Sequence, residues 1–427
     1  MTADTNNKKK RVVSGMRPTG RLHIGHYFGA LQNWVRLQSD PSYECFYFIA
    51  DWHALTSDYA DTSAVAQNTI EIMTDYLAAG LDPAKSVIFQ QSLVPEHAEL
   101  HLLLSMVTPL GWLERIPTYK EALENVKDKD LHNYGFLGYP VLQCADIVIY
   151  SSPDISGLFV PVGEDQVSHV ETSREIVRRF NLANAELQLP MLKDETWSGL
   201  ISSVGIFDAR ESERLGHLAY AGRVEEVKDG LLRTYKAAPL NEKASYLNNG
   251  IGALTHLLIE PGAMLTKTPR IPGLDGRKMS KSYGNTITLS ETDDDIRKKT
   301  KVMVTDPARK RRTDPGNPDV CPVYDWHKLF SPPETLQWAA QGCRTAGIGC
   351  IECKAKMADH LIQWITPVRE RRVKWEHDSN GVVEMIHAGS NRARVEAQKT
   401  MQRVREAVFG WEKKRKEIAG GKTVATS

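Results

Sequence analysis

The chain lacks the long hydrophobic segments that a membrane protein needs. No stretch of its 427 residues approaches the roughly 18 consecutive apolar residues of a spanning helix. Residues 1–10 are polar and lack the apolar core of a secretory signal peptide. We therefore expect a cytoplasmic protein whose residues 1–10 form a disordered tail.

An excess of charge of one sign is also missing. The chain carries 54 Lys and Arg residues against 53 Asp and Glu residues, a formal net charge of +1. Overall charge therefore does not indicate a nucleic-acid partner, and any basic surface must come from local clusters. No internal repeat is evident.

The chain does show a regular alternation of two patterns. Apolar runs typical of strands alternate with segments of helical period, and 41% of the residues are hydrophobic, enough for two or three domains. The runs are 11–14, 45–50, 87–90 and 158–162, and the helical segments are roughly 24–38, 62–80, 96–108 and 163–180. This alternation predicts an α/β fold, a Rossmann-like doubly wound parallel sheet with ligands at the carboxyl ends of its strands.

A short motif follows the first predicted strand. His23-Ile24-Gly25-His26 comes after a Gly/Pro turn and opens a helical pattern. Backbone N–H groups and the helix dipole favour an anion at such a place. Both histidines can donate hydrogen bonds to phosphate oxygens, and Gly25 leaves the backbone open to a flat purine. Alone, a four-residue match of this kind often arises from chance or core packing.

A second motif lies late in the chain. Lys278-Met279-Ser280-Lys281-Ser282 stands on a loop flanked by Gly273 and Gly284. Its two lysines could meet charge that develops on a phosphoryl group, although a basic loop can also be merely solvated. The joint occurrence of both motifs, in this order, favours nucleotidyl transfer.

The two motifs resemble those of class I aminoacyl-tRNA synthetases. Further segments are similar to bacterial tryptophanyl-tRNA synthetases in particular, over about residues 11–190 and 268–410. They are Pro18-Thr19-Gly20, Ala50 to Thr56, Gly138 to Tyr150, and Val160-Pro161-Val162-Gly163-Glu164-Asp165-Gln166. The related tyrosine enzymes carry a Gly-Ser-Asp-Gln type sequence where this chain has Gly-Glu-Asp-Gln.

The resemblance implies a tryptophan–tRNA ligase, which forms tryptophanyl-adenylate from L-tryptophan and ATP and transfers the amino acid to tRNA(Trp). It implies a homodimer and Mg²⁺ that arrives with ATP. A tyrosyl-tRNA synthetase, or another nucleotidyltransferase of the same superfamily, is the alternative. A small-molecule nucleotidyltransferase would need neither a helical C-terminal domain nor the lysine loop.

The resemblance also implies a domain plan. The catalytic domain comprises 11–190 plus 268–290, an all-helical anticodon-binding domain comprises 291–410, and 411–427 is a tail. The last helix of 291–410 could pack back on the catalytic domain. Residues 191–267 exceed the family's short link and form an insertion, either a subdomain against the catalytic face or surface decoration. Helices near 222–235 and 241–259 and a strand or hairpin at 199–208 are expected within it.

The family's functional residues map onto the motifs. By resemblance, His23, His26, Lys278 and Lys281 stabilise charge in the activation step. The ATP-binding residues implied are Arg17, Thr19, Gly20, Gly25, Gly163, Asp165, Lys278, Ser280 and Lys281. The tryptophan-binding residues implied are Asp146, Tyr139, Gln166, His53 and Gln143. Asp146 is the expected acceptor for the indole N–H, which only donates. On its own, an Asp in an apolar segment is more often a helix-edge or ion-pair residue.

Cysteines are few, and four of the six are grouped. Cys321, Cys343, Cys350 and Cys353 are separated by 21, 6 and 2 residues, whereas Cys45 and Cys144 lie in apolar segments and are expected to be inert. In a cytosolic chain such a group favours metal over disulfides, and zinc is the generic ligand. A subset of bacterial tryptophanyl-tRNA synthetases carries a [4Fe–4S] cluster on nearly this spacing, and we favour that cluster with Zn²⁺ as the alternative.

Basic residues gather beyond the lysine loop. They include 309–312, Arg369, Arg371, Arg372, Arg392, Arg394 and Lys399, with a further run at 413–416. If the chain binds tRNA, we expect the contacts among the first groups, whereas the 413–416 run is expected to be solvated.

Overall fold

The computed structural model describes residues 8–125, 130–189, 209–248, 251–265 and 271–421. Five parallel strands form the central sheet in the order β3-β2-β1-β4-β7. They are β1 (Lys10–Met16), β2 (Tyr43–Ile49), β3 (Val87–Gln90), β4 (Gly157–Val162) and β7 (Gly262–Leu265). The predicted doubly wound parallel sheet is confirmed.

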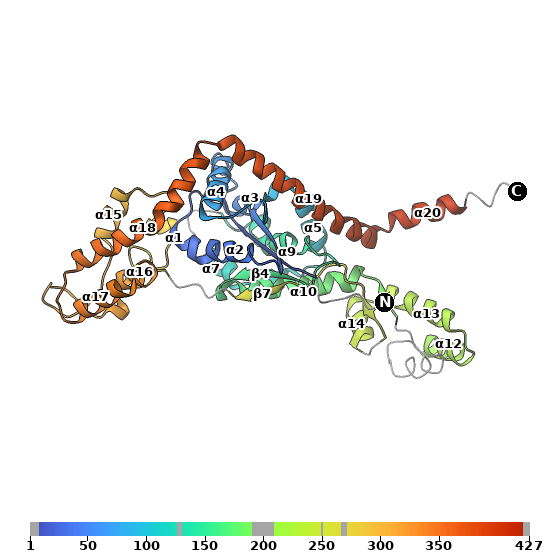
Figure 1. Ribbon diagram of the computed structural model, residues 1–427. Coiled ribbons are helices and arrows are strands. Elements are labelled where there is room, and N and C mark those ends of the chain that lie inside the picture. Colours follow the sequence, from blue (N-terminus) through green and yellow to red (C-terminus); the bar gives the residue numbers. More distant parts are fainter. Residues whose placement is uncertain (1–7, 126–129, 190–208, 249–250, 266–270, 422–427) are drawn as a thin grey trace.

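Helices cover both faces of the sheet (Figure 1). Val12 and Val13 on β1 are fully buried and point to opposite faces, as consecutive strand residues do. Val12 packs in one core with α2 (Gln32–Leu37) and α4 (Val65–Ala79). Val13 packs in a second core with α5 (Glu96–Ser105), α9 (Tyr139–Val148) and α10 (Val167–Asn184). Burial on both faces explains why the strands read as continuous apolar runs.

The strand order reverses between β1 and β4, and ligands of such sheets bind at that point. β1 leads into the turn before α1 (Ile24–His26), and β4 leads into η4 (Glu164–Gln166). The single helix predicted for 24–38 is instead α1, a π-helical turn η2 (Tyr27–Leu31) and α2. π-Helical turns are frequent at functional sites, and the helical period of the sequence does not reveal them.

Short elements around the sheet complete this half of the molecule. They are α3 (Asp51–Asp58), η3 (Gln91–Leu93), α6 (Leu110–Leu113), α7 (Pro117–Asn125) and α8 (Tyr134–Leu137). β5 (Leu187–Gln188) and β6 (Ala253–Leu254) form a separate antiparallel pair.

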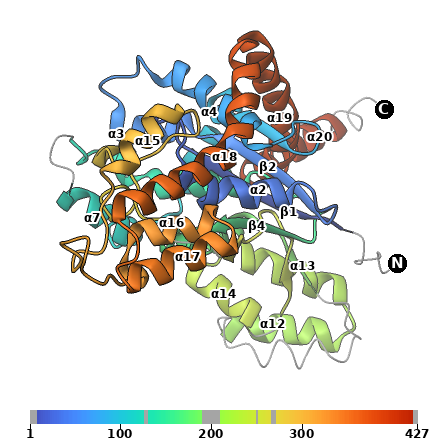
Figure 2. The ribbon, with the colours of Figure 1, turned by 60° about the vertical axis from the view of Figure 1, so that its left-hand side comes forward.

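The insertion forms a small helical unit of its own. α12 (Ala209–Tyr220), α13 (Val224–Ala237) and α14 (Leu240–Asn248) pack around a core that includes Leu215, Leu231 and Tyr246. Tyr235 donates a hydrogen bond to the Leu182 carbonyl near the end of α10. Figure 1 shows this unit away from α1, and therefore away from the expected catalytic face, and Figure 2 shows its three helices together below the sheet.

Three expectations for the insertion need correction or stay open. The helix expected for 241–259 ends at Asn248, and residues 251–259 are not helical. The expected boundaries 191–267 are too wide, because β7 joins the main sheet beside β4; this four-residue edge strand is only half-buried and carries little apolar signal. The strand or hairpin expected at 199–208 lies outside the described residues.

Beyond the lysine loop the chain is helical. The elements are η5 (Lys281–Tyr283), α15 (Asp293–Lys301), η6 (Pro318–Val320), α16 (Pro322–Phe330), α17 (Pro333–Arg344), α18 (Cys350–Glu376), α19 (Ser379–Phe409) and α20 (Trp411–Gly421). The segment 411–427, expected to be a tail, thus contains a helix; α19 ends at Gly410 in a left-handed conformation, and α20 begins directly after it. None of the described helices is long and apolar enough to cross a membrane.

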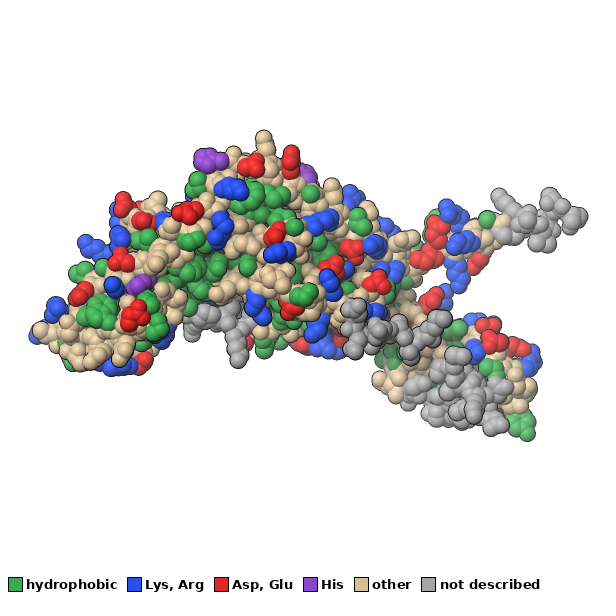
Figure 3. All heavy atoms as spheres, in the orientation of Figure 1, with side chains coloured by type: hydrophobic (Ala, Val, Ile, Leu, Met, Phe, Trp, Pro, Cys, Tyr) green, Lys and Arg blue, Asp and Glu red, His purple; other side chains and the backbone are tan. Residues whose placement is uncertain are grey.

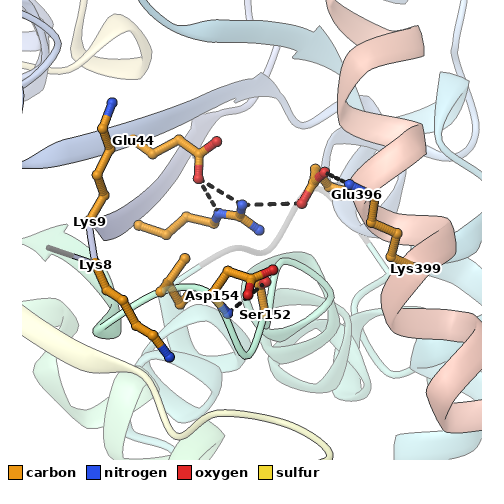
Figure 4. A pocket seen from close by; sticks show the side chains of 9 residues that line it. Lys8, Lys9, Glu44, Ser152, Asp154, Glu396 and Lys399 are labelled. Atoms are coloured by element: carbon orange, nitrogen blue, oxygen red, sulfur yellow. Dashed lines mark hydrogen bonds and ion pairs between the residues drawn. The ribbon is translucent and has the colours of Figure 1, made fainter. Parts of the chain in front are cut away.

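The helix α19 runs back along the half of the molecule that contains the sheet, and it lies against β3, α4 and α5. A Cβ atom at Gly389 would stand 1.7 Å from the Ile88 carbonyl oxygen, so only glycine permits this approach. Two turns after Gly389, α19 also contacts the sheet through an ion pair. Arg11 on β1 pairs with Glu44 on β2 at 2.7 Å and with Glu396 on α19 at 3.1 Å. Figure 4 shows Glu44 and Glu396 on opposite sides of the pocket that this pairing spans.

Candidate active site

The two histidines of the first motif hold each other in place. The backbone N–H of His26 donates to His23 Nδ1 at 3.3 Å, and the backbone N–H of His23 donates to His26 Nδ1 at 3.2 Å. The two rings stack with centroids 3.6 Å apart. His23 is the N-cap of α1, so this reciprocal pair also satisfies N–H groups that a helix start leaves unpaired.

These hydrogen bonds fix the protons on the rings. Because each Nδ1 accepts, a neutral ring carries its proton on Nε2. Burial, with a smaller contribution from the charge of Lys281, lowers the pKa of His23 to about 4. Burial, and then the charges of His23 and Lys281, also hold the pKa of His26 well below its usual value. Both imidazoles are therefore neutral at pH 7 and have Nε2–H donors.

The lysine loop lies directly on the first motif. The Lys281 ammonium donates to the Gly20 carbonyl at 2.7 Å and to the Thr19 carbonyl at 2.9 Å. A Cβ atom at Gly25 would stand 2.9 Å from His23 Nδ1 and 3.3 Å from Met279 Sδ. Glycine at this position therefore accommodates the loop and the His23 ring, in addition to any ligand.

Asn285, which sequence analysis missed, holds the lysine loop in shape. Its side chain is buried, donates to Asp275 at 2.7 Å and to the Lys278 carbonyl at 3.1 Å, and accepts the Ser280 N–H at 2.8 Å. Just beyond it, Ile287 accepts the Ile24 N–H at 3.0 Å. The two motifs are thus brought together by backbone pairing as well as by Lys281. Lys278 itself is exposed.

Asp146 is fully buried at the centre of a polar cluster. Its carboxylate is hydrogen-bonded to His97 Nδ1 at 2.6 Å, to His53 Nε2 at 2.7 Å and to Gln91 Nε2 at 2.7 Å. His97 Nε2 in turn lies 2.8 Å from the Tyr150 hydroxyl. Burial alone would raise the pKa of Asp146, but the hydrogen bonds from His53 and His97 outweigh it and hold the pKa at about 2. Asp146 is therefore a charged acceptor; of its three hydrogen-bond partners, only His53 was expected near it.

The remaining residues of the expected tryptophan site surround a second small network. The Tyr139 hydroxyl lies 2.7 Å from Thr118 Oγ1, which lies 2.9 Å from His169 Nε2. Burial raises the pKa of Tyr139, and the Thr118 hydrogen bond and then the charge of Arg17 partly oppose this effect. Gln143 and Gln166 are half-buried, on α9 and η4 respectively. Gly163 precedes η4, and the Asp165 side chain lies outside the described part.

Of the four grouped cysteines, Cys321 lies between η6 and α16, Cys343 lies on α17, and Cys350 and Cys353 lie at the start of α18. Burial, followed by the charges of the other three thiols, raises the pKa of Cys353 to about 12, so all four groups interact electrostatically. Cys353 Sγ lies 3.4 Å from His327 Nε2, and the Arg309 guanidinium lies 3.9 Å from Cys343 Sγ. In the described part of the chain, no three His, Cys, Asp or Glu side chains are already arranged to hold a metal ion.

Many basic residues expected to contact RNA instead bind the protein itself. Arg372 is 1% exposed and pairs with Asp75, and Arg309 is buried against the Ile348 carbonyl. The prediction of RNA contacts was wrong for these two, because sequence does not reveal which acid or carbonyl an arginine faces. Others bind the catalytic half, among them Arg371 at the Ala78 carbonyl, Arg392 at the Pro83 carbonyl and Arg394 at Glu96. Lys310, Arg311 and Arg312 are exposed.

Comparison with known proteins identifies the family. The family model described as tRNA synthetases class I (W and Y) matches residues 5–196 and 242–365. The stretch left out, 197–241, contains α12 and α13 of the insertion. The tryptophan–tRNA ligase of Ralstonia nicotianae is 47% identical over 93% of this chain and 98% of its own length. That of Thermotoga maritima is 42% identical over 93% of this chain and 98% of its own length.

Solved structures agree with the sequence comparisons. Tryptophanyl-tRNA synthetase from Campylobacter jejuni, in complex with ADP and tryptophan, superposes with a TM-score of 0.68 at 27% identity, over 93% of this chain and 99% of that one. The tryptophan assignment is confirmed over the tyrosine alternative, since relatives across nearly the full chain are tryptophan enzymes. The chain therefore belongs to the class I tRNA synthetases for tryptophan and tyrosine, and within them to the tryptophan–tRNA ligases.

Proposed function

We propose that the first motif and the lysine loop form the ATP site of this ligase. In the activation step an oxygen of the tryptophan carboxylate attacks the α-phosphorus of ATP. The bond from that phosphorus to the bridging oxygen breaks, and pyrophosphate leaves with the electron pair. Such a step requires no nucleophile from the protein, so its residues act by positioning and by stabilising charge.

The hydrogen bonds that place the protons of His23 and His26 on Nε2 are the main support for this assignment. Neutral N–H donors can bind phosphate oxygens without the desolvation cost of two buried cations. Lys281 supplies the positive charge. When ATP binds, the Lys281 ammonium would replace the hydrogen bonds to the Thr19 and Gly20 carbonyls with hydrogen bonds to phosphate oxygens. Lys278 and Ser280, with Arg17 on the facing turn, complete the set. Mg²⁺ enters on the phosphates of ATP and neutralises part of their charge.

Pyrophosphate exchange, measured with each amino acid in turn, tests the proposal. Exchange should depend on tryptophan and be absent with tyrosine. Loss of exchange in variants of the first motif, with tRNA binding unchanged, would support the assignment of the ATP site. Exchange at the wild-type rate in those variants would refute it.

We further propose that Asp146 selects tryptophan by accepting the indole N–H. Of its three donors, His97 and Gln91 are completely buried, whereas the His53 side chain is 13% exposed. His53 is therefore the donor that an incoming indole would displace. Tyr139 and Gln166, with Gln143 on the same helix as Asp146, would line the rest of this pocket.

The chemistry of the donor set supports a metal centre at Cys321, Cys343, Cys350 and Cys353. Four thiols that interact with one another suit four-thiolate ligation of either zinc or a [4Fe–4S] cluster. Cys321 is buried, and Arg309 lies beside Cys343; burial raises the pKa of the Cys343 thiol, and the charge of Arg309 partly opposes this effect. We favour the [4Fe–4S] cluster, held by these four thiolates, because the spacing is close to that of the family's cluster-bearing members.

For tRNA(Trp) we propose that the anticodon half binds next to the exposed Lys310, Arg311 and Arg312. On the face shown in Figure 3, basic and acidic side chains are intermixed, so binding would rest on such local groups. The basic run of α20 is expected to remain solvated.

A homodimer is supported by an apolar surface in the catalytic half. Leu102 on α5, Met106 directly after it and Leu110 at the start of α6 are 54%, 72% and 62% exposed. Large apolar side chains grouped in this way mark an interaction surface. We propose that a second copy covers them, and that the enzyme works in the cytoplasm, where ATP and tRNA are available.

A further inference from the structure

A buried ionic link joins the C-terminal helices to the first motif. Arg372 on α18 is 1% exposed and donates short hydrogen bonds to Glu71 and Asp75, which stand one turn apart on α4. Asp75 is completely buried. Its second oxygen accepts the Leu22 backbone N–H at 2.6 Å, directly before His23. One carboxylate thus connects a guanidinium of the helical domain with the backbone of the motif.

The same link reaches the segment beyond the lysine loop. Arg21 donates to Glu71 at 3.0 Å and to Ser290 Oγ at 3.2 Å. The charge of Asp75 also favours the protonated form of Lys281. The group formed by Arg372, Glu71 and Asp75 therefore contacts the residue before the first motif and, through Arg21, the segment after the lysine loop.

Polar contacts add to apolar packing at this junction, where α4 and α18 also share one hydrophobic core. A cleft of about 450 Å³ remains here between α15, α18 and Arg21, lined by Arg369, Arg372 and Glu376 among others. Buried ion pairs add little to stability compared with apolar side chains of the same size, but they require a defined geometry. An arrangement of this kind therefore adds a defined geometry to a junction that is also packed through apolar side chains.

We propose that Asp75 is a positioning residue of the ATP site and that Arg372 holds it in place. The position of α18, and with it of the helical domain, is thereby transmitted to the turn that carries His23. This inference rests on the proposed role of the first motif in binding ATP. It adds two residues that touch neither ATP nor tryptophan.

The test compares Arg372→Gln with Arg371→Gln in the full-length protein. Arg371 is the matched control, since it also joins α18 to α4 but donates to the Ala78 carbonyl, at 2.7 Å, instead of Asp75. In tryptophan-dependent pyrophosphate exchange without tRNA, Arg372→Gln should lower kcat/KM for ATP by roughly 10-fold or more, as expected for a misplaced site. In Arg372→Gln the KM for tryptophan should change less than about twofold. In Arg371→Gln, both kcat/KM for ATP and the KM for tryptophan should stay within about twofold of the wild-type values. Equal losses in both variants, or an equal rise in both KM values, would overturn the proposal.

A second variant keeps the proposal testable if Arg372→Gln folds poorly. Asp75→Asn keeps an oxygen for the Leu22 N–H but loses the charge that Arg372 requires. If both residues act through one link, the double variant should lose no more activity than the worse single variant. Additive losses would mean that the two residues act separately and would refute the link. If exchange depends on His26 but not on Asp75 or Arg372, the ATP-site assignment stands and only this inference fails.

Discussion

The Lys281 ammonium lies 2.7 Å from the Gly20 carbonyl oxygen, and this hydrogen bond closes the lysine loop over the turn before His23. Burial lowers the pKa of Lys281 to about 8, and the charge of Asp75 only partly opposes this effect. The charged form exists below that pKa, so its contribution is present at pH 7 and is lost as the pH rises through 8. We predict that tryptophan-dependent pyrophosphate exchange declines above pH 8 with an apparent pKa near 8.

Lys281→Arg provides the control, because a guanidinium stays charged throughout this range. The variant should exchange pyrophosphate more slowly than the wild type at pH 7, because the planar guanidinium does not match the geometry of the ammonium. Its exchange rate should nevertheless not fall between pH 8 and 9. A decline of the same shape in the variant would assign the titration to another group.

Two substitutions at His26 should separate catalysis from helix capping. His26→Asn retains an acceptor for the His23 N–H and loses the Nε2–H donor. We predict that it lowers the exchange rate by a factor on the order of 10², as for loss of one preorganised donor, with little change in thermal stability. His26→Gln presents a donor near the Nε2 position but loses the cap, so it should keep more activity and lose about 1 kcal/mol of unfolding free energy. The reverse pattern would make His26 a structural residue.

Asp146 should carry the discrimination for the indole N–H. A site built to hydrogen-bond a substrate group strongly rejects an analogue without it, because buried polar groups are left unpaired. The wild-type enzyme should thus disfavour a tryptophan analogue with sulfur or oxygen in place of the indole N–H. Asp146→Asn should lose most of this preference, measured as the ratio of kcat/KM values in exchange. If the wild type already treats both substrates alike, Asp146 does not read the indole.

The choice of Asn over Ala at position 146 matters. Removal of the whole carboxylate would strand His97 and Gln91, which are buried and hydrogen-bonded to it. The resulting loss of stability, typically about 1–3 kcal/mol for one unsatisfied buried group, would obscure the effect on specificity.

The cysteine group should bind metal and affect tRNA charging more than amino acid activation. With an iron–sulfur cluster, anaerobically purified protein should be brown and contain iron and labile sulfide. Cys350→Ser should bleach it, whereas Cys45→Ala, in the core of β2, should leave colour and metal content unchanged. Colourless protein with stoichiometric zinc would assign a zinc site. Metal-free, fully active protein would refute metal binding.

The exposed Arg311 and Arg312 should contribute to tRNA binding through phosphate contacts. Replacing both with Gln should weaken aminoacylation and make the slope of log K against log salt shallower by about 1.4 to 1.8, for two phosphate contacts. Pyrophosphate exchange should be unaffected. Replacing Lys414 and Lys416 on α20 is the control and should change neither measurement. An equal loss of exchange in the Arg variant would indicate a structural role.

Sequence was most informative where short contiguous segments form the proposed ATP site. His23, His26 and Lys281 could be singled out because strand, turn and helix signals surround them. The parallel sheet was predictable for a similar reason, since β1 to β4 are buried on both faces and read as apolar runs. Neither inference depends on which distant residues meet.

Contacts across long sequence separations could not be foreseen. Arg372 meets Asp75 from 297 residues away, and nothing in the local charge pattern distinguishes it from the exposed Arg311. Asn285 is a single amide whose role depends on a loop closing around it. His97 and Gln91 reach Asp146 from a different helix and turn. β7 is short and half-buried, so its place in the sheet is decided by pairing with β4 alone.

The contact between α19 and β3 has a consequence for the integrity of the folded chain. β3 is the outermost strand on its side of the sheet, and such a strand offers unpaired N–H and C=O groups to any other extended segment. Ser390 on α19 accepts the Gln90 N–H at 3.2 Å, and Gly389 rests on the Ile88 carbonyl. The helix α19 thus blocks the open edge of β3, and a chain truncated before Ser379 would expose this edge to intermolecular strand pairing and aggregation.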